Sequence, residues 1–324
     1  MSYYVSLLAV YFVVYALGAL AMNLQFGLAG IVNFALIIFE AAGAYAAALV
    51  TLGRPTALSG QTYFWGAHWP FPLPLIAATA AGGVLALILG PATMRRMRRD
   101  YQAAAMIVLA LIANQVVTND PGLLNGAEGL AGVPQPLAGS LGVNSTTYGW
   151  IYVVFALAVG AAIYWVLRRV SLAPFGRALR AVRDDETAAA AAGKSPWRLR
   201  MIAFVLGGAI AGLAGGILVE FIGGWSPSGW EYQETFVLLV AVLLGGIGNE
   251  RGALLGAFLV GIVLLQLSTF LPPVGYPGLI DSLDWVIIGA AWLVVLWVRP
   301  RGLLPERTEL GLVRLPAVNA IGHS

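Results

Sequence analysis

The chain has 324 residues, of which 60% are hydrophobic and only 10% are charged. A soluble domain usually carries about 25% charged residues, so this composition excludes a water-soluble globular protein. The sequence contains no cysteine, which excludes disulfides and thiolate metal sites. Its two histidines, His68 and His323, lie outside the apolar runs, so neither a metal site nor a histidine proton relay is expected within a membrane.

Nine apolar segments approach the length of about 20 residues that a membrane-spanning helix needs. The first follows Met1 without a basic region or a nearby cleavage site, which favours a first transmembrane helix over a removed signal peptide. The second is so long that it must tilt or break near Gly27 and Gly30, and the seventh is unusually short. The nine segments are residues 3–24, 27–52, 72–91, 101–119, 149–167, 199–222, 233–247, 252–271 and 280–298.

Basic residues divide very unevenly among the connections between these segments. With nine crossings, 17 of the 18 Lys and Arg residues fall on one side, and only Arg54 falls on the other. The positive-inside rule assigns the basic side to the cytoplasm. We therefore expect a single transmembrane domain over residues 1–324, an external N-terminus, a cytoplasmic C-terminus and an external loop at residues 120–148.

The longest cytoplasmic connection, residues 168–200, has the pattern of two short helices. Residues 174–183 form a basic amphipathic segment that begins with proline. Asp184 or Asp185 can cap a second helix, and Gly193 suits the position just after its end. From the residues alone, this pair fits equally well a docking surface for a soluble partner or an ordinary hairpin on the membrane surface.

Polar residues inside the predicted spans indicate where a pathway could run. Glu40 lies near the middle of the second segment, where a carboxylate must face a cavity or a partner. Asn33 lies seven residues earlier, on the same helical face. Asn114 and Gln115 are further candidates, although such amides also serve to tie helices together. The glycine-rich run at residues 207–216 predicts a close-packed helix face.

These features come together in a resemblance that covers nearly the whole chain. The sequence resembles the branched-chain amino-acid ABC transporter permease family, especially its LivM-type members. The matching stretches are residues 27–30, 43–45, 125–134, 175–186, 211–215, 244–248 and 299–304.

The resemblance implies an all-α, polytopic helical bundle of about 8–10 transmembrane helices in the bacterial cytoplasmic (inner) membrane. It implies a transport subunit and not an enzyme, which translocates branched-chain or other small amino acids into the cytoplasm. The implied partners are a second related permease, two ATP-binding cassette subunits, a periplasmic or extracellular substrate-binding protein and membrane lipid, with no nucleic acid. ATP and Mg would be bound by the partner subunits, and no cofactor by this chain.

The same resemblance makes residues 168–200 the counterpart of the loop that couples such permeases to their ATPases. Small residues at Ala188 and Ala189 would then let one face seat in a groove of the ATPase. The residues that this implies for coupling are Arg177, Arg180, Arg183, Asp185, Glu186, Ala189 and Gly193.

The sequence departs from the family pattern around residues 33–36. Family members often have a Ser-Leu-Gly-His-like run there, whereas this chain has Asn-Phe-Ala-Leu, and Glu40 replaces a usually apolar residue. A related importer of urea, short amides or another small polar solute is therefore an alternative. A more remote alternative is an ion-coupled secondary transporter that uses Glu40, and ATP dependence of uptake separates the two.

Overall fold

The structure is a computed structural model, and it describes most of the chain up to Leu264. The described residues are 2–55, 60–94, 99–138, 142–264 and 302–306, with isolated residues between 286 and 298. Most of the predicted ninth span, residues 280–298, and the end of the eighth, residues 265–271, therefore lie outside the described residues.

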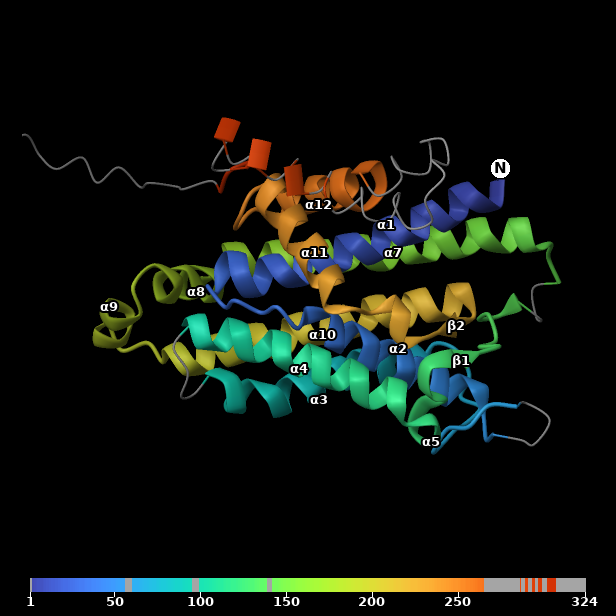
Figure 1. Cartoon of the computed structure of the whole chain (residues 1–324). Coiled ribbons are helices and arrows are strands. Elements are labelled where there is room, and N and C mark those ends of the chain that lie inside the picture. Colours follow the sequence, from blue (N-terminus) through green and yellow to red (C-terminus); the bar gives the residue numbers. More distant parts are fainter. Residues whose placement is uncertain are drawn as a thin grey trace, which may run out of the picture.

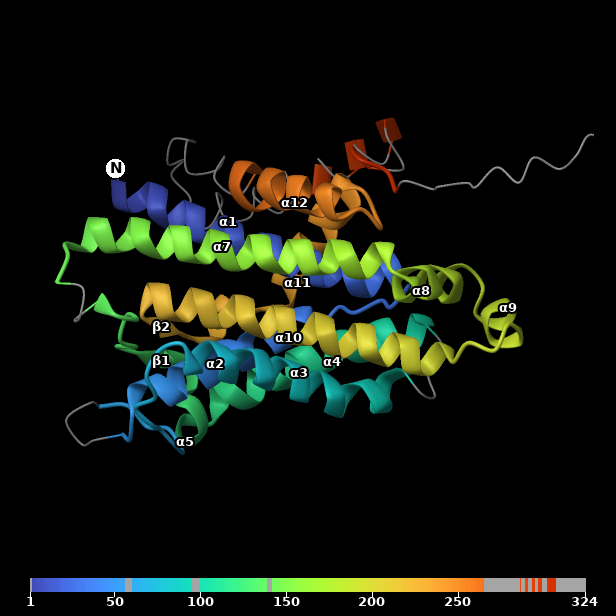
Figure 2. The same ribbon diagram turned by 180° about the vertical axis from the view of Figure 1, so that it is seen from behind.

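The described chain is almost entirely helical (Figures 1 and 2). Its α-helices are α1 (Ser2–Met22), α2 (Leu36–Leu52), α3 (Leu73–Met94), α4 (Arg99–Asn119), α5 (Pro121–Leu124), α7 (Ser145–Leu172), α8 (Pro174–Asp184), α9 (Glu186–Ala191), α10 (Pro196–Ile222), α11 (Tyr232–Gly245) and α12 (Glu250–Phe258). Its other elements are the π-helices η1 (Asn23–Leu28) and η4 (Leu259–Leu264), the 3-10 helices η2 (Gly126–Glu128) and η3 (Pro227–Gly229), and the strands β1 (Leu130–Ala131) and β2 (Gly224–Trp225).

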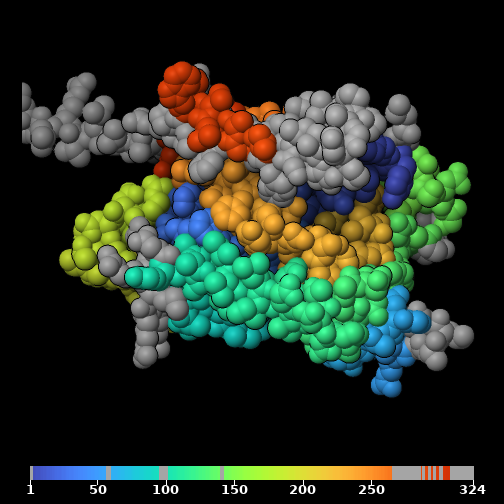
Figure 3. All heavy atoms as spheres, in the orientation of Figure 1, coloured from blue at the N-terminus to red at the C-terminus, as the bar shows by residue number. Residues whose placement is uncertain are grey.

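Five of the described helices are long and apolar enough to cross a membrane, namely residues 3–28, 73–94, 101–119, 145–172 and 196–222. Large apolar side chains on α3 and α4, such as Ile88 and Ile112, are more than half exposed. These two helices form a continuous outer face in Figure 3, where they are teal to green. A face of this kind suits lipid or another apolar subunit and not water. The chain is therefore an all-α polytopic membrane protein.

Helix α10 lies at the centre of the bundle and packs against α1, α2 and α3. Its glycines allow backbones to approach closely: a methyl group at Gly43 would overlap the Gly212 carbonyl oxygen, and one at Gly82 would overlap that of Gly208. This confirms the close-packed face predicted for residues 207–216. Small residues drive helix association in membranes because they allow such backbone contact.

The second predicted span is broken, as its length suggested. Helix α1 continues through η1 to Leu28, and α2 begins only at Leu36. Between them the chain has no regular structure, and Gly30 has a φ of +66°. Helix α2 has 17 residues, about 26 Å of helix, which is less than a hydrocarbon core of about 30 Å.

A second break lies between α10 and α11. After Ile222 the chain continues as β2 and η3, and α11 begins at Tyr232 with 14 residues. In this segment Trp225 and Trp230 are buried, and the Trp230 indole N–H donates to the Tyr45 hydroxyl oxygen at 3.3 Å. The starts of the two short helices touch, because the Ile37 N–H donates to Oγ1 of Thr235 at 3.2 Å.

The two ends of the bundle differ in structure. Helices α8 and α9 project from one end, whereas the N-terminus, α5 and the β1–β2 pair lie at the other (Figure 1). Strand β1 pairs antiparallel with β2, and the Gln61 side chain exchanges two hydrogen bonds with Ala131. The predicted connections 168–200 and 120–148 therefore lie at opposite ends, as the charge pattern requires.

Candidate functional site

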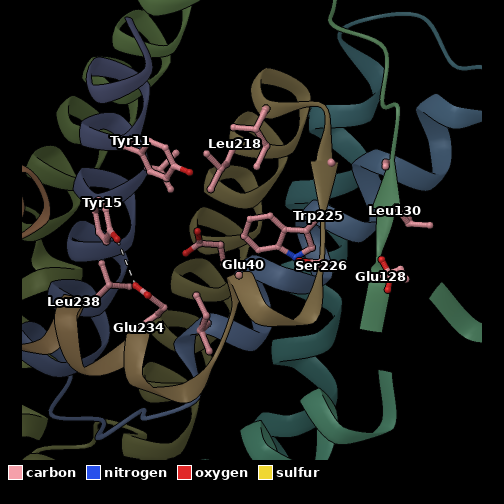
Figure 4. A pocket seen from close by; sticks show the side chains of 16 residues that line it. Tyr11, Tyr15, Glu40, Glu128, Leu130, Leu218, Trp225, Ser226, Glu234 and Leu238 are labelled. Carbon is pink, nitrogen blue, oxygen red and sulfur yellow. Dashed lines mark hydrogen bonds between the residues drawn. The ribbon is translucent and has the colours of Figure 1, made fainter. Parts of the chain in front are cut away.

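A cavity of about 440 Å³ lies inside the bundle, between α1, α2, α10, α11 and the β1–β2 pair (Figure 4). This volume falls in the range of small-molecule sites. Its wall combines apolar side chains with the aromatic residues Tyr11, Tyr15 and Trp225. Because β1 and β2 contribute to it, the cavity lies toward the end opposite α8 and α9.

Glu40 is the carboxylate of α2 that faces this cavity. Its residue is only 5% exposed, and Figure 4 shows its side chain directed into the space. Among the described residues it has no hydrogen-bond or ion-pair partner. The location agrees with the expectation that a carboxylate within the membrane faces a cavity.

Two further carboxylates line the same cavity. Glu234, in the first turn of α11, accepts a long hydrogen bond of 3.4 Å from the Tyr15 hydroxyl. The second is Glu128, the last residue of η2. The residues of the described chain that line the cavity include no Lys, Arg or His.

Asn33 does not share a helical face with Glu40, so that expectation is wrong. It lies in the irregular segment before α2, is 1% exposed and does not line the cavity. Its Nδ2 donates to Oε1 of Gln25 at 2.7 Å, and its Oδ1 accepts the Ala35 N–H at 2.9 Å. Gln25 in turn donates to the Phe204 carbonyl oxygen. Asn33 therefore satisfies the backbone at a break in the membrane.

Asn114 and Gln115 also lie outside the cavity wall. Asn114 Nδ2 donates to the carbonyl oxygen of Pro227 at 2.9 Å, which ties α4 to the segment between α10 and α11. Gln115 is exposed and accepts hydrogen bonds from Asn119 on its own helix. The Asn114 side chain thus ties two segments together, whereas that of Gln115 bonds only within its own helix.

The caps predicted in the 168–200 connection are present. Asp185 is the N-cap of α9, and its Oδ1 accepts hydrogen bonds from the Thr187 hydroxyl and from the amides of Thr187 and Ala188. These bonds, chiefly that of the hydroxyl, lower the pKa of the Asp185 carboxyl. Gly193 has a φ of +74°, and its amide and that of Lys194 close a Schellman pattern on α9.

Arg180 and Arg183 connect α8 to other parts of the chain. Both form ion pairs with Glu306, at 2.6 and 3.0 Å, and both are partly buried. Arg183 also pairs with Asp184 and donates a hydrogen bond to the carbonyl oxygen of Gly27, where η1 ends. Helix α8 is thereby attached to the first break.

The remaining residues expected to take part in coupling have different surroundings. Arg177 is exposed and donates to the Leu172 carbonyl oxygen, and Glu186 pairs with Arg200 at 2.7 Å. Ala189 is only 5% exposed, whereas its neighbour Ala188 is exposed. Ala189 therefore packs within the chain and does not offer a surface for a groove, because the short helix α9 turns this side toward its own protein.

Sequence reasoning missed Glu234, although the signal was available. It lies inside the predicted seventh span, and the argument made for Glu40 applies equally to it. Glu220 is a second such case, within α10: it is 1% exposed but does not line the cavity. Glu306 could not have been found in this way, because its partners lie more than 100 residues earlier.

Comparison with known proteins identifies the family. Residues 4–296 match the family described as branched-chain amino acid transport system / permease component. The chain belongs to this family of ABC transporter permeases. No solved structure matches.

Individual relatives agree with this membership over most of the chain. The LivM permease protein of the high-affinity branched-chain amino acid transport system of Salmonella typhimurium is 27% identical, over 92% of this chain and 70% of its own. A probable LivM protein of Methanocaldococcus jannaschii is 26% identical over 94% of both chains. The LivH permease protein of Salmonella typhimurium is 27% identical, over 90% of this chain and 91% of its own.

Proposed function

We propose that this chain is the membrane-spanning permease subunit of a binding-protein-dependent ABC importer, driven by ATP that partner subunits hydrolyse. The import of a small amino acid is supported by the names of the LivM and LivH relatives. Those names also support a second related permease as a partner. Two ATP-binding subunits and a substrate-binding protein complete the proposed assembly in the inner membrane.

The observation that carries this proposal is the connection of α8 to the first break. Arg183 contacts both Glu306 and the Gly27 carbonyl oxygen, and Gly27 precedes the segment that leads into α2. Helix α2 carries Glu40 into the cavity. A movement of α8 imposed by an ATPase can therefore reach the cavity through a short series of contacts, with the broken backbone as the element that changes shape.

In this mechanism, each part of the chain has a distinct task. The cavity receives the solute from the β1–β2 end, where the proposed binding protein docks. Helices α8 and α9 contact the ATPases at the opposite end. The short helices α2 and α11 meet between these ends through Ile37 and Thr235, so a shift of one helix would displace the other.

The test is uptake by the assembled transporter in proteoliposomes. We expect uptake of a labelled amino acid to require ATP on the side of the membrane that corresponds to the cytoplasm, which is the vesicle lumen. Uptake should stop when the ATPase subunit cannot hydrolyse ATP. Uptake driven by a proton or sodium gradient without ATP would instead identify an ion-coupled secondary transporter, and would contradict the proposal.

A further inference from the structure

The cavity wall is acidic and aromatic at the same time. Glu40, Glu128 and Glu234 line it together with Tyr11, Tyr15 and Trp225. We propose that the cavity selects a solute with net positive charge: an alkylammonium or guanidinium compound such as an amino acid with a basic side chain. This inference rests on the proposed import function, and it names the class of substrate.

The first argument is the state of Glu40. A carboxylate that is 95% buried needs a partner, because an isolated buried charge is very costly. Among the described residues Glu40 has none, and its side chain points into the cavity (Figure 4). A cationic group in the cavity would supply the missing partner, through hydrogen bonds to a charged acceptor.

The second argument is that no basic residue of the described chain lines the cavity to balance these carboxylates. All Lys and Arg residues except Arg54 belong to the connections at the α8–α9 side of the predicted topology. Arg54 is exposed and lies fourteen residues after Glu40, about 20 Å along a helix. A solute with a net negative charge would therefore be repelled, and a positive one attracted.

The third argument concerns the carboxylate of a zwitterionic amino acid. Broken membrane helices often hold such a group at their N-terminal amides. Here the Ala35 N–H already donates a hydrogen bond to Asn33 Oδ1, and the Ile37 N–H donates one to Thr235 Oγ1. The start of α11 already carries Glu231 and Glu234, which compensate the positive helix end. The helix starts therefore favour a solute whose positive charge is in excess.

The aromatic residues support the same class. The faces of Tyr and Trp rings attract ammonium and guanidinium groups by cation–π interaction. A metal ion fits less well, because no group of three His, Cys, Asp or Glu side chains within the described chain is close enough together to hold one. The three carboxylates come from different elements, namely α2, η2 and α11, which suits an organic cation of several atoms.

The test compares lysine with norleucine, which has the same carbon chain but lacks the terminal ammonium. Binding of each is measured on the assembled transporter in nanodiscs, by displacement of radiolabelled lysine. We expect lysine to displace the label, and norleucine and leucine to bind at least about tenfold more weakly, since a hydrogen bond to a charged group is lost.

Glu40→Gln should weaken lysine binding by about tenfold or more, and Glu234→Gln provides a second variant should the first fail to fold. Asp120→Asn removes an exposed carboxylate outside the cavity, at the N-cap of α5, and should leave binding unchanged because Asn also caps a helix. Equal binding of lysine and norleucine, or unchanged lysine binding in folded Glu40→Gln and Glu234→Gln, would overturn the proposal.

Uptake separates this inference from the function on which it rests. ATP-driven uptake of leucine but not of lysine would leave the importer intact and refute the cationic substrate. Binding of lysine that depends on Glu40, without any ATP-driven uptake, would establish the cationic site and refute the importer.

Discussion

The guanidinium of Arg183 on α8 donates a hydrogen bond to the carbonyl oxygen of Gly27, 156 residues earlier in the chain. That carbonyl lies where η1 ends, at the first break in the membrane-spanning backbone. Nearby, Asn23 Oδ1 accepts the N–H of Gly248 from the turn between α11 and α12. Helix α8, the first break and the end of α11 are thus joined at one end of the bundle.

Removing this contact should uncouple transport without unfolding the protein. Arg183→Gln loses the ion pair with Glu306 and the charge-assisted hydrogen bond to Gly27, each a strong polar contact. We expect normal membrane insertion, about tenfold slower ATP-driven uptake, and ATPase activity that no longer responds to substrate. Arg251→Gln, which removes an exposed guanidinium on the same predicted side, serves as the control. Equal uptake by both variants would argue against a role of Arg183 in coupling.

Gly193 provides a test of the geometry of α9. Its φ of +74° costs a residue with a side chain about 1–2 kcal/mol, and a β-branched residue more, although no neighbouring atom lies within 4 Å of a methyl group placed there. Gly193→Val should therefore abolish substrate-stimulated ATPase activity by distorting the end of α9. Gly193→Asn should retain most of it, because Asn tolerates this conformation.

Comparing these two variants separates backbone conformation from surface contact. If the ATPase recognises only the backbone shape of α9, Gly193→Asn keeps the activity that Gly193→Val loses, despite the larger side chain of Asn. If both variants fail equally, the small surface at residue 193 matters instead, and the conformational explanation is incorrect.

The parts of the site that sequence predicted are those fixed by neighbouring residues. The caps at Asp185 and Gly193 depend on hydrogen bonds spanning only a few residues, so the pattern was sufficient. Length alone predicted that the second segment tilts or breaks near Gly27 and Gly30, and the structure shows the break. The position of Asn33 could not be inferred in the same way, because seven residues place two side chains on one face only if the helix is continuous.

The cavity itself depends on contacts between distant segments. Trp225 lines the cavity because β2 pairs with β1, which lies nearly 100 residues earlier in the chain. No local sequence pattern predicts that pairing. A broken second segment and a short seventh segment were nevertheless indications of a binding site, since broken or short spans often form one in transporters. Both segments carry a carboxylate of the cavity wall, Glu40 and Glu234.

The orientation of the chain can be measured by cysteine labelling, because the protein contains no cysteine of its own. Asn144 and Ser195 are matched positions: both are exposed, and both precede a long helix without donating or accepting a side-chain cap hydrogen bond. We expect Asn144→Cys to react with an impermeant maleimide in intact cells, and Ser195→Cys to react only after the membrane is opened. The reverse pattern would invert the topology derived from the basic residues.

The contact between α2 and α10 can be tested with a single methyl group. Gly43→Ala places that group against the carbonyl oxygen and Cα of Gly212, both of which are backbone atoms that cannot turn aside. Overpacking of this kind costs typically about 1–3 kcal/mol, and here it would also displace the helix that carries Glu40. We expect a lower melting temperature of the purified protein and reduced uptake. Gly83→Ala makes the same chemical change where the nearest atom, Cβ of Ala209, is 3.4 Å away, and it should be nearly neutral. Because both substitutions raise helix propensity equally, a difference between them reports the backbone contact alone, and equal melting temperatures would show that α2 and α10 can move apart at little cost.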